Sequence, residues 1–298
     1  MHAGNLTETS FVGRDANRLV ADVAGPEGGP PVVLLHGGGQ TRHSWGTTAL
    51  ALAAHGWRAY SVDLRGHGES DWVPDGDYTI EAFAGDVEAI ATSLEQRPAL
   101  VGASLGGLAS LAALGTGSGR RLATALVLVD VAPRIEDSGR DRIGRFMMEH
   151  MESGFASLEE VADAIQRYNP HRPRPKDLSG LKKNLRERDG RWYWHWDPRF
   201  ISGRWGSADE TRSTLVDTAD MEEAARRLDV PLLVVRGLVS DLLSEEGARQ
   251  VLELVPQAEL VSVDGAGHMV AGDRNDLFND AVVDFLTRSQ PATPHREP

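Results

Sequence analysis

Six short apolar runs recur along this chain, and their rhythm constrains the fold more than any other feature. The runs are residues 31–36, 59–63, 99–102, 125–130, 231–236 and 259–263. Continuous apolar runs of this length are typical of strands that are covered on both faces, as in a parallel sheet. Helical stretches at 79–95, 105–114 and 274–288 would connect such strands. Residues 9–23 are typical of an antiparallel hairpin. The sequence therefore predicts an α/β fold with a mostly parallel central sheet flanked by helices.

One region breaks this rhythm. Between Asp130 and Pro231 no strand-like run occurs, and a loop of that length without structure of its own would be unusual. Its composition is helical, as in residues 158–165. We therefore expect an inserted helical cap over residues 134–225, and a core made of residues 1–133 and 226–289. The Pro-rich, polar residues 290–298 predict a disordered tail.

Composition and charge exclude several classes of protein. The chain has no cysteines, so disulfides, thiolate metal sites and a cysteine nucleophile are excluded. The net charge of −13 would repel a nucleic-acid backbone. No apolar stretch is long enough to span a membrane, and the first ten residues lack the apolar segment of a secretory signal. We expect a cytoplasmic protein that has neither nucleic acid nor membrane as a partner; a homodimer stays open.

The segment Leu100–Gly107 carries the clearest chemical signal. It contains Gly102-x-Ser104-x-Gly106 between a predicted strand and a predicted helix. The motif alone is weak in a chain with 32 glycines, but this context is that of a nucleophile elbow. A sharp strand-to-helix turn would expose the Ser104 hydroxyl. The amide of Leu105 would lie at a helix N-terminus, where it can stabilise an oxyanion.

A second glycine-rich loop, His36-Gly37-Gly38-Gly39, follows the first predicted buried strand. Glycines at this point let a backbone N–H face a bound carbonyl closely. We expect the amide of Gly38 to join that of Leu105 in an oxyanion hole. The alternative is a flexible turn after a strand.

A nucleophilic serine needs a base, and the base needs a group that orients it. We choose His268, because it lies in a glycine-rich loop just past the last predicted strand, at the same edge of the sheet as Ser104. Two acids compete: Asp241, which follows the strand 231–236, and Asp130, which ends the strand before it. Asp241 gives the chain order Ser, Asp, His that is typical of this kind of site. Asp130 is interpreted as a structural carboxylate or a cap hinge.

The other histidines are interpreted as incidental. His36, His43 and His67 follow earlier strands and are taken as polar loop residues, whereas His150, His171 and His195 fall in the cap.

Together these segments resemble the α/β-hydrolase superfamily. The resemblance rests on the elbow at 102–106, the His36-Gly37 loop, the stretch Asp63-Leu-Arg-Gly-His-Gly-Glu-Ser70, Asp241 and Gly267-His268, and it covers almost the whole chain outside the cap. Within that superfamily the chain is similar to bacterial esterases, cofactor-free haloperoxidases and cap-bearing epoxide hydrolases. It departs from epoxide hydrolases and haloalkane dehalogenases, whose elbow carries an aspartate. It also has Gly38 where many relatives carry an aromatic residue, which predicts a wider pocket.

The cap carries the question of the substrate. Residues 191–200 hold five aromatic rings, and Trp192, Trp194 and Trp196 would share one side if the segment is extended. Such rings either form an apolar roof over the substrate or anchor the cap to the core. We expect Trp194, Trp196 and Met269 to contact the substrate. The basic segment 171–191 would either attract an acidic substrate or form a solvated cap surface.

The sequence therefore predicts a serine hydrolase that cleaves a small apolar ester or lactone. Its catalytic residues are Ser104, Asp241 and His268, and it needs no cofactor. No His-Glu-x-x-His metal site is present, and no metal is expected. Three alternatives stay open: a cofactor-free haloperoxidase or perhydrolase, a hydrolase of carbon–carbon bonds, and a receptor-like binding protein on the same scaffold.

Overall fold

The structure of this chain is a computed structural model that describes residues 5–115, 122–134, 136–170, 174–205, 217–238, 240, 242–264 and 275–289. Of the predicted site residues, Asp241, His268 and Met269 lie outside these ranges, as does the tail 290–298.

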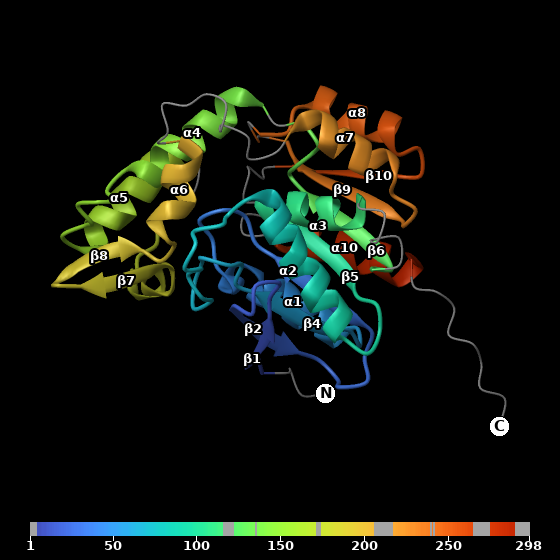
Figure 1. The fold of residues 1–298 in the computed structure, drawn as a ribbon, viewed down its shortest axis with the longest axis horizontal. Helices are drawn as coiled ribbons and strands as arrows, with labels where there is room; N and C mark the ends of the chain where they lie inside the picture. The colour runs from blue at the N-terminus through green and yellow to red at the C-terminus, as the bar shows by residue number, and fades with distance from the viewer. Residues whose placement is uncertain are drawn as a thin grey trace.

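An eight-stranded sheet forms the centre of the molecule, with strand order β1-β2-β4-β3-β5-β6-β9-β10 (Figure 1). The pairs β1–β2 and β2–β4 are antiparallel, and the remaining pairs are parallel. The predicted hairpin and all six predicted strands are confirmed, but β10 lies at the edge of the sheet and buries only Val263. Their bounds are β1 (Thr7–Val12), β2 (Arg18–Ala24), β3 (Pro31–Leu35), β4 (Arg58–Val62), β5 (Ala99–Ala103), β6 (Ala125–Val129), β9 (Leu232–Gly237) and β10 (Glu259–Val263).

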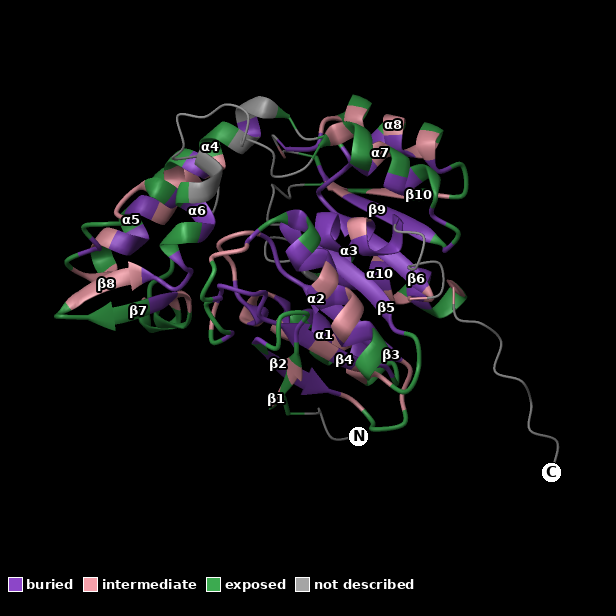
Figure 2. Ribbon diagram, in the orientation of Figure 1, coloured by how far each residue is buried: buried purple, intermediate pink, exposed green. Residues whose placement is uncertain are grey.

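Alternate residues of the strands pack into two hydrophobic clusters, one on each face of the sheet. In β3, for example, Val33 and Leu35 belong to one cluster and Val32 and Leu34 to the other. This two-sided burial explains why the strands read as continuous apolar runs. One cluster is completed by α1 (Gly46–Ala54) and α10 (Asn275–Ser289), and the other by α2 (Ile80–Ser93), α3 (Leu105–Gly115), α7 (Thr218–Arg226) and α8 (Glu245–Leu254). In Figure 2 the inner strands of the sheet are buried and the outer faces of these helices are exposed.

The insertion between β6 and β9 stands beside the core (Figure 1). It contains helices that begin at capped residues: Ser157, for instance, accepts a hydrogen bond from the amide of Glu160 at the start of α5. Its elements before α7 are α4 (Asp137–Met148), α5 (Leu158–Tyr168), the short 3₁₀ helix η3 (Ser179–Asn184), the strands β7 (Leu185–Arg188) and β8 (Arg191–Trp194), and α6 (Pro198–Trp205).

The predicted cap differs from the structure in two respects. First, it is not wholly helical, because β7 and β8 pair as an antiparallel hairpin. Asp189 and Gly190 join them with φ of 53° and 72°, which matches the two-residue turn that Asp-Gly sequences favour. Second, α7 packs against α3 of the core: a Cβ placed on Gly115 would lie 2.2 Å from Cβ of Ala224. The part that stands apart from the core therefore ends at α6, before the predicted boundary at 225.

Among the described helices, none combines the length and the apolar character that crossing a membrane requires.

Candidate active site

Ser104 occupies a sharp turn between β5 and α3. Its φ is +45°, a left-handed conformation that is uncommon for a residue with a side chain. A Cβ on Gly102 would lie 2.4 Å from N of Gly107, and one on Gly106 would lie 2.4 Å from the carbonyl oxygen of Leu35. Both glycines are therefore required by close backbone approach. The geometry is that of the predicted nucleophile elbow.

The loop at residues 36–40, here the glycine loop, follows β3 and lies directly beside this turn. A Cβ on Gly37 would be 3.3 Å from Cβ of Ser104. The amide of Gly106 donates to the carbonyl of His36 at 3.2 Å, which ties the start of α3 to the end of β3. The second predicted segment therefore adjoins Ser104.

Hydrogen bonds hold the glycine loop on both sides of Gly38. The amide of Gly37 donates to Oε1 of Gln40 at 3.1 Å, and the carbonyl of Gly37 accepts from the amide of Gln40 at 3.1 Å. The amide of Gly39 donates to Nε2 of His67 at 3.1 Å. Among the described residues the amide of Gly38 has no acceptor, and Leu105 N–H belongs to the first helical turn, whose amides lack intrahelical acceptors. These are the two predicted oxyanion donors.

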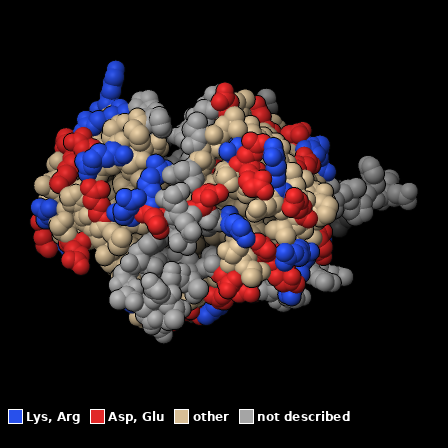
Figure 3. All heavy atoms as spheres, turned by 90° about the horizontal axis from the view of Figure 1, so that it is seen from above, with Lys and Arg blue, Asp and Glu red and all other residues tan. Residues whose placement is uncertain are grey.

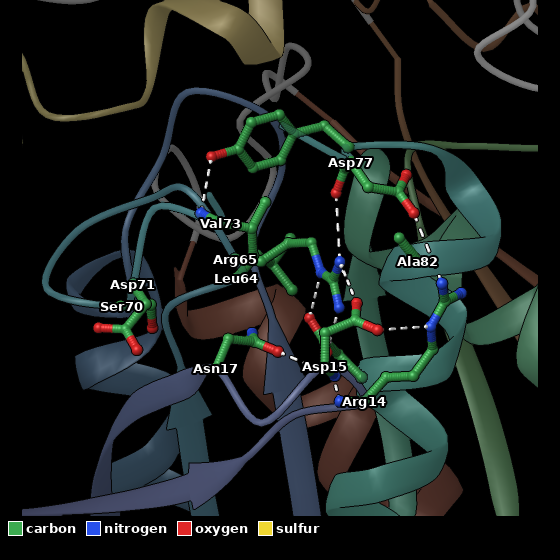
Figure 4. A network of polar contacts seen from close by, with 12 residues as sticks. Arg14, Asp15, Asn17, Leu64, Arg65, Ser70, Asp71, Val73, Asp77 and Ala82 are labelled. Carbon is green, nitrogen blue, oxygen red and sulfur yellow. Dashed lines mark hydrogen bonds and ion pairs between the residues drawn. The ribbon is translucent and has the colours of Figure 1, made fainter. Parts of the chain in front are cut away.

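The loop that carries His67, residues 63–70, is fixed by buried ion pairs. The fully buried guanidinium of Arg65 bonds to Asp86 at 2.6 and 2.7 Å and pairs with Asp15 at 2.9 Å. It also donates to the carbonyl of Asp77, as Figure 4 shows. Burial works to lower the pKa of Arg65, but its hydrogen bonds to Asp86 and Asp15 outweigh it and raise that pKa. Because removing one partner of a buried ion pair lowers the stability of the fold, these ion pairs hold the loop in one conformation.

A second network fixes the start of the same loop. The guanidinium of Arg42 bonds to Asp63 at 2.6 Å, to Asp22 at 3.0 Å and to Glu69 at 2.5 Å. Asp63 also accepts from the amides of Arg42 and Glu69 at 2.6 and 3.0 Å. These contacts join the end of β4 to the residues that follow the glycine loop.

Asp130, the second candidate acid, is fully buried at the end of β6 with φ of +51°. Its carboxylate accepts from the amide of Gly237 at 3.2 Å and from the hydroxyl of Ser240. Ser240 immediately precedes Asp241 in the chain, so Asp130 fixes the loop that leads to the first candidate. The roles of Asp241 and His268 stay predictions.

The cap contacts the glycine loop through apolar side chains. A Cβ on Gly39 would lie 2.9 Å from Cε of Met147 and 3.2 Å from Cζ3 of Trp196, and one on Gly38 would lie 3.4 Å from Cζ of Phe200. All three cap side chains are buried. Neither Met147 nor Phe200 is among the site residues that the sequence predicts. Phe200 belongs to the aromatic stretch 191–200, but nothing in the pattern ranks it above its neighbours.

Trp194, in contrast, lies behind Trp196 and farther from the glycine loop. Its ring stacks on that of Trp196 with centroids 5.0 Å apart, and its Nε1 donates to the carbonyl of Glu149 at 3.3 Å. The Nε1 of Trp196 is buried without a hydrogen-bond partner in the described structure. Of the two predicted substrate contacts, Trp196 is therefore nearer to the glycine loop.

The cap docks on the core through buried polar groups at residues 195–199, here the docking segment. Asp197 accepts from the hydroxyl of Tyr78 at 2.6 Å and from Arg199, which also donates to the carbonyls of Val73 and Pro74. Burial and the bond to Asp197 raise the pKa of Tyr78. Burial works to raise the pKa of Asp197 as well, but the hydrogen bonds from Arg199 and Tyr78 outweigh it and keep that carboxyl ionised.

A pocket of about 710 Å³ lies between the cap and the core. Lys182, Lys183 and Arg186 line it from the cap, and they belong to the basic segment 171–191, of which residues 171–173 lie outside the described ranges. His195 lines the same pocket and also bonds to the carbonyl of Gly39, so it is shared by the pocket and the glycine loop. On the face in Figure 3, acidic and basic side chains are interspersed.

Comparisons with known proteins agree with this geometry. Residues 32–281 match the alpha/beta hydrolase family, and the chain belongs to it. The chain is 31% identical to the esterase Rv0045c of Mycobacterium tuberculosis over 257 residues, which cover 82% of this chain and 78% of that protein. It is 26% identical to a non-heme chloroperoxidase of Streptomyces lividans, with coverage of 88% and 93%.

Among solved structures, that of E-2-(acetamidomethylene)succinate hydrolase superposes with a TM-score of 0.81 at 22% identity, covering 95% of this chain and all of that one. A likeness at that identity supports the fold alone. The family and the similarity to esterases support a hydrolase activity for this chain.

Proposed function

We propose that this protein is a serine hydrolase that cleaves a carboxylic ester or lactone through Ser104, His268 and Asp241. One observation carries most of the proposal. The glycine loop is hydrogen-bonded on both sides of Gly38, while the Gly38 amide has no protein acceptor in the described structure and lies beside the elbow of Ser104. A fixed donor without a protein acceptor, beside a half-buried serine at a sharp turn, is what a developing oxyanion requires.

In the proposed reaction the hydroxyl oxygen of Ser104 attacks the carbonyl carbon of the substrate, and His268 accepts the hydroxyl proton. The carbonyl oxygen becomes an oxyanion held by the amides of Gly38 and Leu105. The C–O bond to the leaving alcohol then breaks, and His268 donates its proton to that alcohol. Water then attacks the carbonyl carbon of the acyl-enzyme, and His268 accepts a proton from that water. The C–O bond to Ser104 breaks, His268 donates the proton to the Ser104 oxygen, and the acid is released.

The buried cap residues support an apolar substrate. Met147, Trp196 and Phe200 form the surface nearest to the glycine loop, and such side chains favour an apolar acyl or alcohol group. The unpaired Nε1 of Trp196 adds one donor that a polar atom of the substrate would satisfy. We propose Trp194 and Met269 as further contacts, as the sequence predicts.

The similarity to a non-heme chloroperoxidase supports a second candidate. In that case hydrogen peroxide replaces water in the second half-reaction, and the acyl group leaves as a peracid. Both reactions use the same acyl-enzyme and differ only in whether water or peroxide attacks it. Adding peroxide to a turnover assay and measuring the peracid therefore distinguishes them.

The decisive test is covalent labelling of the nucleophile. A fluorophosphonate probe should form one adduct, located by mass spectrometry on the peptide with Ser104, and Ser104→Ala should abolish it. The same variant should lower ester turnover by up to about six orders of magnitude, as in another serine hydrolase. A folded protein that is not labelled would favour the receptor-like alternative. Esters, lactones and diketones compared as substrates would then define the bond that is cleaved.

A further inference from the structure

Three buried histidines surround the glycine loop, and their hydrogen bonds define the protonation of each ring. Nδ1 of His36 contacts the carbonyl of Gly37 at 2.8 Å, and its Nε2 accepts from the amide of Leu64 at 3.0 Å. A ring nitrogen that faces a carbonyl must carry a proton, and one that faces an N–H must not. His36 is therefore neutral, with its proton on Nδ1.

The same argument applies to the other two rings. Nδ1 of His67 faces the carbonyl of Arg65 at 2.9 Å, and its Nε2 accepts from the amide of Gly39 at 3.1 Å. His195 has the opposite tautomer: its Nδ1 accepts from the amide of Gly68 at 2.7 Å, and its Nε2 donates to the carbonyl of Gly39 at 3.2 Å. Burial lowers the pKa of His36 and that of His195, the latter to about 3, which keeps these rings neutral.

The backbone N–H and C=O of Gly39 are thus held by histidine rings from two different parts of the molecule. His67, from the rigid core loop 63–70, accepts from the Gly39 amide, and His195, from the docking segment of the cap, donates to the Gly39 carbonyl. The two rings also contact each other, with centroids 5.8 Å apart. Gly39 has φ of +76°, so the chain turns sharply right after Gly38. Fixing Gly39 therefore fixes the peptide plane that follows the free amide.

We propose that His67 and His195 are positioning residues that hold the glycine loop in its oxyanion-binding conformation, and that His195 makes this conformation depend on a docked cap. The inference rests on the proposed function, because it assigns a purpose to the Gly38 amide. Neither ring is proposed to touch the substrate or to move a proton.

The consequence is a direct coupling between the cap and the reacting centre. When the cap moves away, the Gly39 carbonyl loses the donor from His195 while the His67 bond to the amide remains. The loop is then held on one side only. Displacing a catalytic group by about 1 Å can lower a rate about 100-fold, so a loosened loop should slow acylation more than it weakens substrate binding.

Two substitutions at His195 separate this role from a general structural one. Asn places an oxygen near the position of Nδ1, so His195→Asn can keep the bond from Gly68 but not the bond to Gly39. Gln places an amide N–H near the position of Nε2, so His195→Gln can restore the donor to Gly39. Tyr78→Phe is the matched control, because it removes a buried cap-docking bond, to Asp197, and the bond from the Val73 amide, and leaves both bonds to Gly39 intact.

The readouts are kcat and KM for one ester, the rate of fluorophosphonate labelling at Ser104, and the inhibition constant of phenylboronic acid, whose tetrahedral adduct mimics the oxyanion. We expect His195→Asn to lower kcat and the labelling rate about 10- to 100-fold, to weaken boronate binding similarly and to leave KM within about threefold. His195→Gln should regain most of this loss. Tyr78→Phe should stay near the wild type in kcat.

Two variants at His67 supply an independent test if His195→Asn folds poorly. His67→Gln can keep an acceptor for the Gly39 amide, whereas His67→Asn cannot, so the first should be the more active. Equal kcat for the Asn and Gln variants at either position, or a loss in Tyr78→Phe as large as in His195→Asn, would overturn the inference. If the wild type is not labelled at all, the proposed function itself fails, whereas a labelled wild type with unchanged variants contradicts only the positioning role.

Discussion

The interior of the core and the boundary between the core and the cap differ in their contacts. In the core, strands such as β3 and β5 bury apolar side chains on both faces of the sheet. The cap meets the core partly through apolar side chains such as Phe200, and partly through the docking segment, whose buried polar groups, His195 and Asp197, bond to Gly39, Gly68 and Tyr78. Apolar burial is strong but has no direction, whereas hydrogen bonds require one geometry. We infer that apolar burial in the core supplies most of the stability, and that the hydrogen bonds of the docking segment specify where the cap sits over the glycine loop.

The largest effect that we expect concerns the acid of the site, and it separates two carboxylates of the core, Asp241 and Asp130. Asp241→Asn should lower kcat by about four orders of magnitude, since His268 would lose the partner that orients it and stabilises its charge. Asp130→Asn should lower kcat far less, because we propose Asp241 as the catalytic acid, and two of the bonds of Asp130, from Gly237 and Ser240, hold the loop before Asp241. Steady-state kinetics of both variants decide the matter. A reversed order would place the catalytic acid at the end of β6.

Next in size is the contrast in stability between the two kinds of contact. Phe278 is fully buried in the cluster that α1 and α10 cover, so Phe278→Ala should lower the free energy of unfolding by about 3–5 kcal/mol. Tyr78→Phe should cost about 1–3 kcal/mol, because the carboxylate of Asp197 keeps its bonds to Arg199. Urea denaturation measures both. A docking variant as destabilising as the core variant would break the distinction drawn above.

The cap should also influence which substrate is preferred. Trp196→Ala should cost about 1–3 kcal/mol in kcat/KM for an octanoyl ester that reaches the ring, and little for an acetyl ester. Trp196→Phe keeps most of the ring surface but removes the unpaired Nε1, so a selective loss in that variant would show that the indole donates to the substrate. Trp194→Ala should cost less than Trp196→Ala for the octanoyl ester, because the Trp194 ring lies behind that of Trp196. Equal losses for both esters, together with a large drop in stability, would mean that the rings only anchor the cap.

The smallest effect near neutral pH is a dependence of stability on pH. The pKa of His195 is lowered to about 3 in the folded protein by burial and by the neighbouring His36, while Asp63 and Arg186 also face it, so the unfolded chain binds more protons below its ordinary value. Stability should therefore be fully present above about pH 6.5 and fall toward pH 3, by at most about 1.4 kcal/mol per pH unit for this group. His195→Gln should flatten that part of the profile. An unchanged slope would show that His195 is not held neutral.

Much of the fold and half of the site follow from local sequence. Strands covered on both faces read as apolar runs, and the elbow and the glycine loop are short motifs whose glycines have no alternative, as the contacts at Gly102 and Gly106 show. The hairpin of the cap has a local signal too, in Asp189-Gly190, although the composition around it is typical of helices.

The histidine contacts could not be predicted in the same way. His67 and His195 are 128 positions apart, and each looks like an incidental polar residue in its own segment. Their roles arise only when the docking segment of the cap meets loop 63–70, and no periodicity or motif encodes that meeting. The packing of Met147 and Phe200 on the glycine loop has the same origin.

A crystal structure of the protein with a boronic acid bound to Ser104 tests the central claim most directly. The account predicts a covalent bond from the boron atom to Oγ of Ser104, with one boronate oxygen about 2.7–3.1 Å from both the Gly38 and the Leu105 amide nitrogens, and Gly39 still bonded to His67 and His195. A boronate oxygen that points away from the Gly38 amide, or an adduct on another residue, would contradict it.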